Sequence, residues 1–200
     1  MVKAEGFRHG TIQGMKRRIF LAIDLPADLK QQISEAITQW RWLPIRWLTS
    51  ENWHITLVPP IYLEDREAER LTAVVSRGRF GKPFLIHFSR MTLAPPGVAA
   101  RMIWLEGETP PELMQLKKKV GKIIAATEGL PPLKPETRPL HLHATLARFE
   151  SGELKGLESK TRTLGEVDFR FEASEVVVME SHLKPSGAEY ARIATVPLAA

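Results

Sequence analysis

One tetrapeptide pattern, His-x-Thr-Leu, occurs twice and constrains the fold more than any other feature of the chain. The two copies lie at residues 54–57 and 143–146, a little under half of the 200-residue sequence apart. Both lie in apolar segments typical of β-strands, in which residues two apart share a face. Each His and its Thr therefore project together, while the residues beside them can enter a core. The repeat favours a chain of two related lobes, each of which contributes one His-Thr pair.

The rest of the apolar pattern predicts an α+β chain with antiparallel sheets, because strand-like segments outnumber helical ones and return in hairpins. Helices are expected after Asp24, at 64–76 and after Thr109, where apolar residues recur three or four apart. Strands are expected at 18–25, 45–48, 53–58, 83–93, 101–106, 140–149, 167–171, 175–182 and 190–196.

Acidic and proline residues should set several element boundaries. Asp24 is placed to cap the first helix, with Pro26 in its first turn, and Pro44 is placed to end that helix. Pro59 and Pro60 lack the backbone N–H that a strand ladder uses. We therefore expect strand pairing to stop before these two prolines.

Composition bounds the setting in which the chain works. It has no cysteine, which excludes disulfides and thiolate metal sites and agrees with a reducing cytoplasm. No run approaches the ~20 apolar residues of a membrane helix, so no membrane partner is expected. Residues 1–15 are interpreted as a disordered leader, or as a segment before an alternative start at Met15. Residues 16–200 are then expected to form a single bilobal domain that acts as a monomer.

The chain has a modest basic excess, with a net charge of +5 and a sequence pI near 9.6. Such an excess suits an anionic partner, for example nucleic acid. Lys117, Lys118, Lys119 and Lys122 would line one edge of the third helix. This edge can follow an RNA backbone, although a solvated helix face is the favoured interpretation.

Two imidazoles that face each other across a cleft would suit the opening of a cyclic phosphodiester. In-line attack at phosphorus needs one group that takes a proton from water and another that protonates the departing oxygen. Histidine serves both roles, because its pKa of about 6.5 lets both protonation states exist near neutrality. The hydroxyls of Thr56 and Thr145 can donate to a non-bridging oxygen, and Arg148 can bind phosphate in a bidentate manner. The matched pair therefore predicts acid–base catalysis by His54 and His143.

At these residues the sequence resembles the 2H phosphoesterase superfamily, and within it the RNA 2′,3′-cyclic phosphodiesterases, also called 2′-5′ RNA ligases. The likeness runs from about residue 16 to residue 198. It is carried by the opening strand at 18–26, the approach to the first motif at 46–54, the second motif at 138–139 and 143–148, and the closing hairpin at 179–190.

The resemblance implies a bilobal α+β fold with pseudo-twofold related lobes, in which two antiparallel sheets flank a central cleft and helices lie outside. It implies hydrolysis of a terminal 2′,3′-cyclic phosphate to a 2′-phosphate without metal or cofactor. His54 would be the proton donor, His143 the proton acceptor, and Thr56, Thr145 and Arg148 would bind phosphate. RNA ends or tRNA halves would be the partners, and some members also join such halves through a 2′-5′ linkage.

The sequence departs from the family pattern at two places. Residues 58–62 stand where family members carry an aromatic residue, so base stacking would fall to Tyr62 or Phe20. Leu142 replaces the usual proline before the second motif, and His141 shares a face with His143. His141 can tune His143 or touch substrate, although a surface role is favoured.

One basic residue and three alternative functions remain to be considered. Arg46, close before the first motif, is a further candidate for substrate contact. The fold could serve as an RNA-binding module without hydrolysis, or could open the cyclic phosphate of a small nucleotide or sugar. A metal hydrolase could use His54, His141 and His143, but no further firm ligand is evident at motif spacing.

Overall fold

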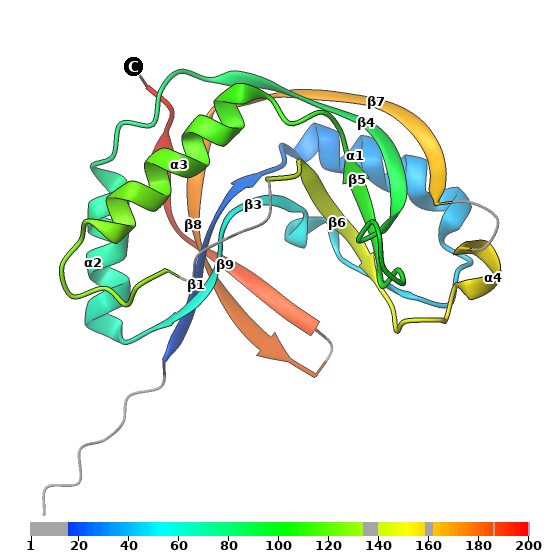
Figure 1. Ribbon diagram of the computed structural model, residues 1–200, viewed down its shortest axis with the longest axis horizontal. Helices are drawn as coiled ribbons and strands as arrows, with labels where there is room; N and C mark the ends of the chain where they lie inside the picture. The colour runs from blue at the N-terminus through cyan, green and yellow to red at the C-terminus, as the bar shows by residue number, and fades with distance from the viewer. Residues whose placement is uncertain (1–15, 134–139, 159–161, 186, 200) are drawn as a thin grey trace, which may run out of the picture.

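The computed structural model describes residues 16–133, 140–158, 162–185 and 187–199. The chain folds into two antiparallel sheets whose outer faces carry the long helices (Figure 1). The predicted leader and the alternative start at Met15 lie outside the described residues. Within these ranges, no helix combines the length and apolar character that a bilayer-spanning segment needs.

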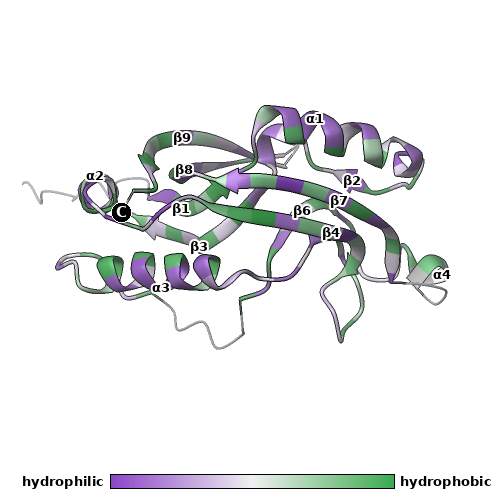
Figure 2. Cartoon of the chain, turned by 90° about the horizontal axis from the view of Figure 1, so that it is seen from above, coloured by the Kyte–Doolittle hydropathy of each residue, from purple (hydrophilic) through white to green (hydrophobic). Residues whose placement is uncertain are grey.

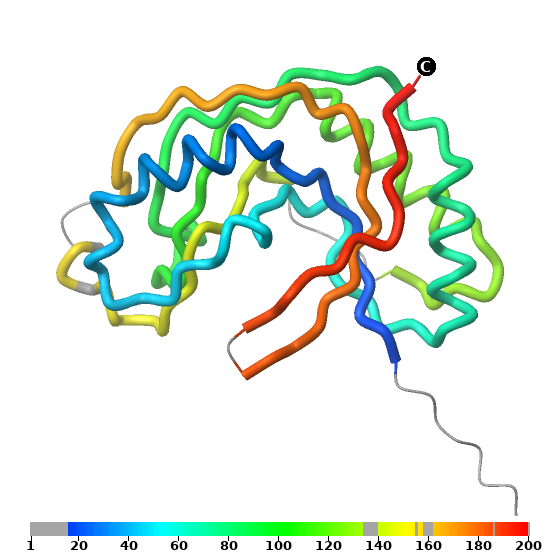
Figure 3. The backbone as a smooth tube through the Cα atoms, turned by 180° about the vertical axis from the view of Figure 1, so that it is seen from behind, coloured from blue at the N-terminus to red at the C-terminus, as the bar shows by residue number. Residues whose placement is uncertain are grey.

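Sheet A has the strand order β3-β1-β8-β9, and sheet B has the order β2-β6-β5-β4-β7. The strands of sheet A are β1 (Arg17–Asp24), β3 (His54–Leu63), β8 (Glu175–Lys184) and β9 (Gly187–Pro197). The strands of sheet B are β2 (Arg46–Trp47), β4 (Phe84–Ala94), β5 (Met102–Glu106), β6 (His143–Arg148) and β7 (Thr163–Ala173). Figure 3 shows the β8–β9 hairpin extending from the middle of the molecule.

Two of the long helices pack on the sheet opposite to the one whose strand they follow. The helices are α1 (Ala27–Ala36), α2 (Asp65–Ser76), α3 (Pro111–Ala125) and the short α4 (Lys155–Glu158), with 3₁₀ turns at Ile37–Trp40 and Ser50–Asn52. Helix α1 follows β1 of sheet A but packs on β7 of sheet B, whereas α2 and α3 pack on sheet A. Figure 2 shows α1 and α3 on opposite sides of the molecule.

The main hydrophobic core lies between the sheets and these helices, and a second, small cluster of Phe20, Ala22, Val177 and Met179 lies in sheet A. Buried residues recur three or four apart on each long helix, for example Leu29 and Ile33 on α1 and Leu116 and Val120 on α3. They belong to one cluster that also includes residues from both sheets. Because the lobes share this core, the sheets are held in a fixed relation to each other.

The expected end of the strand at Pro59 and Pro60 was wrong, because β3 continues through both prolines to Leu63. β3 lies at the edge of sheet A, where a residue without an N–H costs fewer ladder bonds. The pairing of β1 with β3 also shifts here, from Leu21 opposite Val58 to Ile19 opposite Ile61. The prolines therefore lie in a β-bulge.

The expected cap of the first helix was also wrong. Pro26 occupies the N-cap position of α1, and no side chain caps this helix. The Asp24 carboxylate instead accepts hydrogen bonds from the Leu25 backbone N–H (2.9 Å) and from the Lys30 ammonium (2.7 Å). The α-helical turns end before Pro44 and give way to the 3₁₀ turn at Ile37–Trp40.

Two strands begin earlier than expected, namely β7 and β9, and the short helix α4 was not predicted.

The two His-x-Thr copies occupy equivalent places in the two sheets. His54 begins β3, which pairs with β1, and α1 lies between these strands in the sequence. His143 begins β6, which pairs with β5, and α3 lies between them in the sequence. This equivalence agrees with the predicted pair of related lobes.

Candidate active site

His54 is fixed by its own strand. Its Nδ1 donates a hydrogen bond to the Asn52 carbonyl oxygen (2.8 Å), which requires the proton on Nδ1. Its Nε2 lies 3.1 Å from the hydroxyl oxygen of Thr56, two residues along the same face. Nε2 is therefore the nitrogen that remains to exchange a proton with a ligand.

Aromatic rings surround the His54 imidazole on the open face of sheet A. The ring centroids of Phe20 and Tyr190 lie 5.0 and 5.3 Å from that of His54, and 4.8 Å from each other. The side chain of Phe20 is fully buried beneath this group. Tyr62 is 56% exposed and lies opposite Arg18 in the β1–β3 pairing. Of the two residues considered for base stacking, only Tyr62 has a face that solvent reaches.

His143 repeats the arrangement of His54 in sheet B. Its Nδ1 donates to the His141 carbonyl oxygen (2.9 Å), so Nε2 is again the nitrogen left for exchange. The His143 ring stacks on the indole of Trp104, with centroids 4.0 Å apart and planes 24° apart. Thr145 lies opposite Trp104 in the β5–β6 pairing, on the same face as His143.

Each histidine faces a buried carboxylate on the neighbouring strand. Asp24 lies opposite His54, and Glu106 lies opposite His143. The side chain of Asp24 is 6% exposed and pairs with Lys30 and Arg192. The side chain of Glu106 is 8% exposed. It accepts hydrogen bonds from Arg90 Nε (2.7 Å) and His141 Nε2 (2.5 Å).

The electrostatics of the site favour neutral imidazoles in the free protein. The pKa of His54 is lowered to about 4, chiefly by burial and in part by the charge of His143, while the Asn52 carbonyl and Asp24 oppose this shift. Burial also lowers the pKa of His143, again against a backbone carbonyl and a carboxylate, here that of Glu106. The charge of His143 thus acts on His54, although the two residues belong to different sheets.

Basic residues gather where β6 ends. Arg148 lies opposite Arg46 in the β2–β6 pairing, and its Nη1 is 3.6 Å from the sulfur of Met102. Burial lowers the pKa of the Arg148 guanidinium, Tyr190 opposes this, and the charges of nearby arginines add to it. The structure therefore brings Arg46 and Arg148 together, and connects Arg148 electrostatically with both His143 and Tyr190.

Sequence reasoning did not assign a role to four groups at this site. Tyr190 contacts His54, Trp104 stacks on His143, and Asp24 and Glu106 face the two histidines. Each lies distant in sequence from the histidine that it faces or contacts, so only the pairing of strands brings them together. Trp104 and Glu106 lie two residues apart on β5 and so share a face. The β5–β6 register, had it been known, would have placed them opposite Thr145 and His143.

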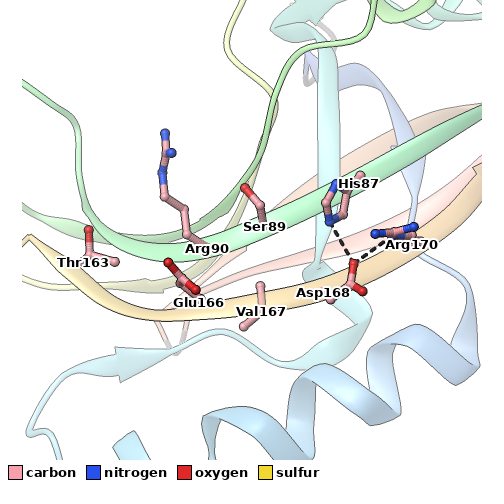
Figure 4. Close-up of a pocket in the computed structure, with 8 residues that line it drawn as sticks. All are labelled: His87, Ser89, Arg90, Thr163, Glu166, Val167, Asp168 and Arg170. Atoms are coloured by element: carbon pink, nitrogen blue, oxygen red, sulfur yellow. Dashed lines mark hydrogen bonds and ion pairs between the residues drawn. The ribbon is translucent and has the colours of Figure 1, made fainter.

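Sheet B also carries an open polar hollow between β4 and β7, with a volume of about 520 Å³. Figure 4 shows Asp168 between His87 and Arg170, which it pairs with at 2.9 and 2.8 Å. Its lining includes Arg90, which binds Glu106, but none of the predicted site residues. Among the residues that the structure describes, no group of three His, Cys, Asp or Glu is placed to hold a metal ion.

The two sheets and the paired His-x-Thr strands are those of the two-histidine class of phosphoesterases, and comparison with known proteins supports this class. The family model described as LigT-like phosphoesterase matches residues 23–104. The RNA 2′,3′-cyclic phosphodiesterase of Escherichia coli is 32% identical over 144 residues, which cover 68% of this chain and 73% of that protein. The chain belongs to the LigT-like phosphoesterase family.

Further relatives agree in fold and in extent. The RNA 2′,3′-cyclic phosphodiesterase of Methanocaldococcus jannaschii is 26% identical over 174 residues, 86% of this chain and 96% of that protein. The crystal structure of E. coli LigT complexed with 3′-AMP superposes with a TM-score of 0.73 at 23% identity, over 92% of this chain and 98% of that chain. The crystal structure of TT0787 of Thermus thermophilus gives a TM-score of 0.72 at 20% identity, over 90% and 97%. The predicted bilobal α+β fold is thereby confirmed.

Proposed function

We propose that this protein is an RNA 2′,3′-cyclic phosphodiesterase that opens a terminal cyclic phosphate to a 2′-phosphomonoester by metal-independent acid–base catalysis. The observation that carries the proposal is the matched orientation of His54 and His143. Each holds Nδ1 on a backbone carbonyl and leaves Nε2 for a ligand, one from each sheet. The names of the two curated relatives supply the substrate class.

The proposed step moves two protons while one bond forms and one breaks. Nε2 of His143 takes a proton from water as the water oxygen bonds to phosphorus. The bond from phosphorus to the 3′ oxygen breaks, and that oxygen receives the proton of His54 Nε2. Thr56 and Thr145 donate hydrogen bonds to non-bridging oxygens, where charge increases in the transition state, and Arg148 binds the same phosphate.

Binding of the substrate can convert His54 into the protonated form that serves as proton donor. In the free protein burial holds the pKa of His54 at about 4, so its imidazole is neutral near pH 7. A bound phosphodiester carries a negative charge, and an opposite charge within a few ångströms favours the protonated imidazole. Binding should therefore raise the pKa of His54 and load it with the proton that the leaving oxygen needs.

The same chemistry allows strand joining. A 5′-hydroxyl of a second RNA end can take the place of water, with the same movements of protons, and the product is then a 2′-5′ linkage.

RNA ends such as tRNA halves are the proposed partners. Because both histidines come from one chain, a monomer suffices, and the absence of cysteine agrees with action in the cytoplasm.

Tyr62 and His141 are the proposed additional contacts to substrate. Tyr62 presents an exposed ring, on which a base can stack. The His141 ring lies 6.2 Å from that of His143, with the planes 29° apart, and Glu106 holds its Nε2. Phe20 supports His54 from below, because its buried ring leaves no face for a base.

The experiment is hydrolysis of an oligoribonucleotide that ends in a 2′,3′-cyclic phosphate, with and without a chelator. His54→Ala and His143→Ala should each lower kcat/KM by roughly 10²–10⁴-fold. His87→Ala, in the separate hollow, is the matched control and should retain wild-type activity. Full activity of the His143→Ala protein would overturn the mechanism. Loss in chelator with recovery on metal addition would favour a metal hydrolase, and binding without turnover an RNA-binding module.

A further inference from the structure

We propose that Arg18, Arg46 and Arg101, together with Arg148, form a second phosphate subsite, which binds the internucleotide phosphate next to the terminal cyclic phosphate. The proposal rests on the proposed function and deepens it, because it names oligoribonucleotides, rather than mononucleotide cyclic phosphates, as the preferred substrates.

Strand pairing brings these arginines together from both sheets. In sheet B, Arg148 lies between Arg46 of β2 and Met102 of β5, and Arg101 immediately precedes Met102. In sheet A, Arg18 of β1 donates a hydrogen bond to the Ser181 hydroxyl (2.6 Å).

The β8–β9 hairpin joins the two halves of the cluster. Ser181, the partner of Arg18, lies opposite Tyr190, whose phenol interacts electrostatically with Arg148. At the end of the same hairpin, a Cβ on Gly187 would lie only 3.4 Å from Nη1 of Arg46. Arg18 and Arg46 therefore flank one hairpin although they belong to different sheets.

The positive charge of this cluster is not balanced in the free protein. None of the ion pairs between described residues involves any of the four arginines. Like charges directly opposite on neighbouring strands are destabilising, and Arg46 faces Arg148 in this way. The charges of the other three arginines also act on Arg148. A bound phosphate would relieve this repulsion, and arginine is well suited to bind it in a bidentate manner.

The arginine cluster lies farther along β6 than His143, toward the end of this strand. Arg148 follows His143 by five residues along β6, with Thr145 between them, so their Cα atoms are separated by about 16 Å. The long side chain of Arg148 can bridge part of this distance, whereas Arg46 and Arg101 lie beside or beyond the end of β6. Two phosphates can therefore be bound at once, one between the imidazoles and one among Arg18, Arg46 and Arg101, with Arg148 between the two phosphates.

The test compares two dinucleotides that both end in a 2′,3′-cyclic phosphate. One has a natural phosphodiester between its nucleosides, and the other has an uncharged methylphosphonate. The wild-type protein should prefer the charged dinucleotide roughly tenfold in kcat/KM, as expected for charge-assisted hydrogen bonds. In the double variant Arg46→Gln with Arg101→Gln this ratio should fall toward one.

Two controls make the outcome decisive. Lys117→Gln with Lys118→Gln removes equal charge from α3 and should retain the wild-type ratio. Binding of the same dinucleotides to the His143→Ala protein measures the subsite without turnover. Equal binding of charged and uncharged dinucleotides, or a ratio unchanged in the double arginine variant, would overturn the subsite. If charged dinucleotides bind preferentially but are never hydrolysed, the proposed function fails and the subsite stands.

Discussion

At the scale of single residues, the site is built from two matched units rather than from two isolated histidines. In each unit a backbone carbonyl fixes Nδ1, an aromatic ring packs on the imidazole, and a buried carboxylate lies on the neighbouring strand. Burial disfavours the charged imidazole, and the carboxylate partly restores it. This balance should decide the pH at which the protein works.

The pH dependence of kcat/KM follows from the lowered pKa values of the free protein. Both His54 and His143 have pKa values below 6.5, that of His54 at about 4. The bell-shaped profile of kcat/KM reports the free enzyme, so its maximum should lie below pH 6.5. The profile of kcat reports the complex, in which phosphate raises these pKa values, and should be displaced toward higher pH. A kcat/KM maximum above about pH 7 would contradict this prediction.

The role of the carboxylates can be measured through the histidines that they face. Glu106→Gln removes the negative charge opposite His143, so the pKa of His143 should fall further. NMR titration of the imidazole resonances measures this shift directly. Glu166→Gln is the control, because β7 is separated from β5 by β4, and it should not change the pKa of His143. An unchanged pKa of His143 in the Glu106→Gln protein would remove the proposed coupling.

Stability should also depend on pH through His54. Folding lowers its pKa from 6.5 to about 4, so the unfolded chain binds the proton more readily between these values. Folding thus favours the neutral imidazole of His54. The free energy of unfolding therefore decreases as the pH falls from about 6.5 toward 4. The loss should reach about 3 kcal/mol. Denaturant unfolding of wild type and His54→Gln at about pH 7 and pH 4 measures it, and an equal pH dependence of both proteins would contradict the assignment.

At the scale of elements, the β8–β9 hairpin carries Tyr190 onto His54 and is attached to the segment before β3. The Asn52 side chain donates a hydrogen bond to the Ala188 carbonyl oxygen (2.7 Å), and the Asn52 carbonyl accepts the bond from His54. One residue thus positions both the hairpin and the imidazole.

Removal of this attachment should affect activity more than stability. Asn52→Ala should lower the free energy of unfolding by about 1 kcal/mol, the usual contribution of one hydrogen bond. It should lower kcat/KM by roughly tenfold, because the hairpin that bears Tyr190 loses its support. Thermal unfolding and steady-state kinetics provide the two measurements. A large loss of stability with unchanged activity would show that Asn52 is structural only.

Elements could be predicted from the sequence where apolar periodicity decides them, as for α2 and α3. Boundaries set by tertiary context could not be predicted. Pro59 and Pro60 stay within β3 because this strand lies at an edge and forms a bulge, which a local pattern does not reveal. Asp24 faces His54 instead of capping α1 because β1 pairs with β3. The His-Thr pairs themselves were predictable, since both members lie in one strand.

At the scale of the whole molecule, the helices cross between the sheets and hold the two sheets in a fixed relation, as the proposed two-histidine site requires. Helix α1 packs on sheet B and α3 on sheet A, and their buried faces join one core. The partners contributed by the opposite sheet, such as Tyr190 near Arg148, depend on this arrangement and could not be read from local sequence.

The same arrangement predicts that residues 16–200 fold as one domain without residues 1–15. Among the residues that the structure describes, the shared core begins at Ile19. Deletion of residues 1–15 should therefore leave the thermal unfolding midpoint and the cooperativity of a single transition unchanged. An unfolded deletion protein would refute the domain assignment.

His54 and His143 are proposed to act on one phosphorus atom in the same step. The most direct measurement is single-turnover hydrolysis of a 2′,3′-cyclic phosphate RNA by wild type, both single His→Ala variants and the double variant, with the product identified by ³¹P NMR. We predict a 2′-phosphate as the product, and a loss in the double variant well below the product of the two single losses, because groups that act together are not additive. A 3′-phosphate product, or losses that multiply independently, would contradict the claim.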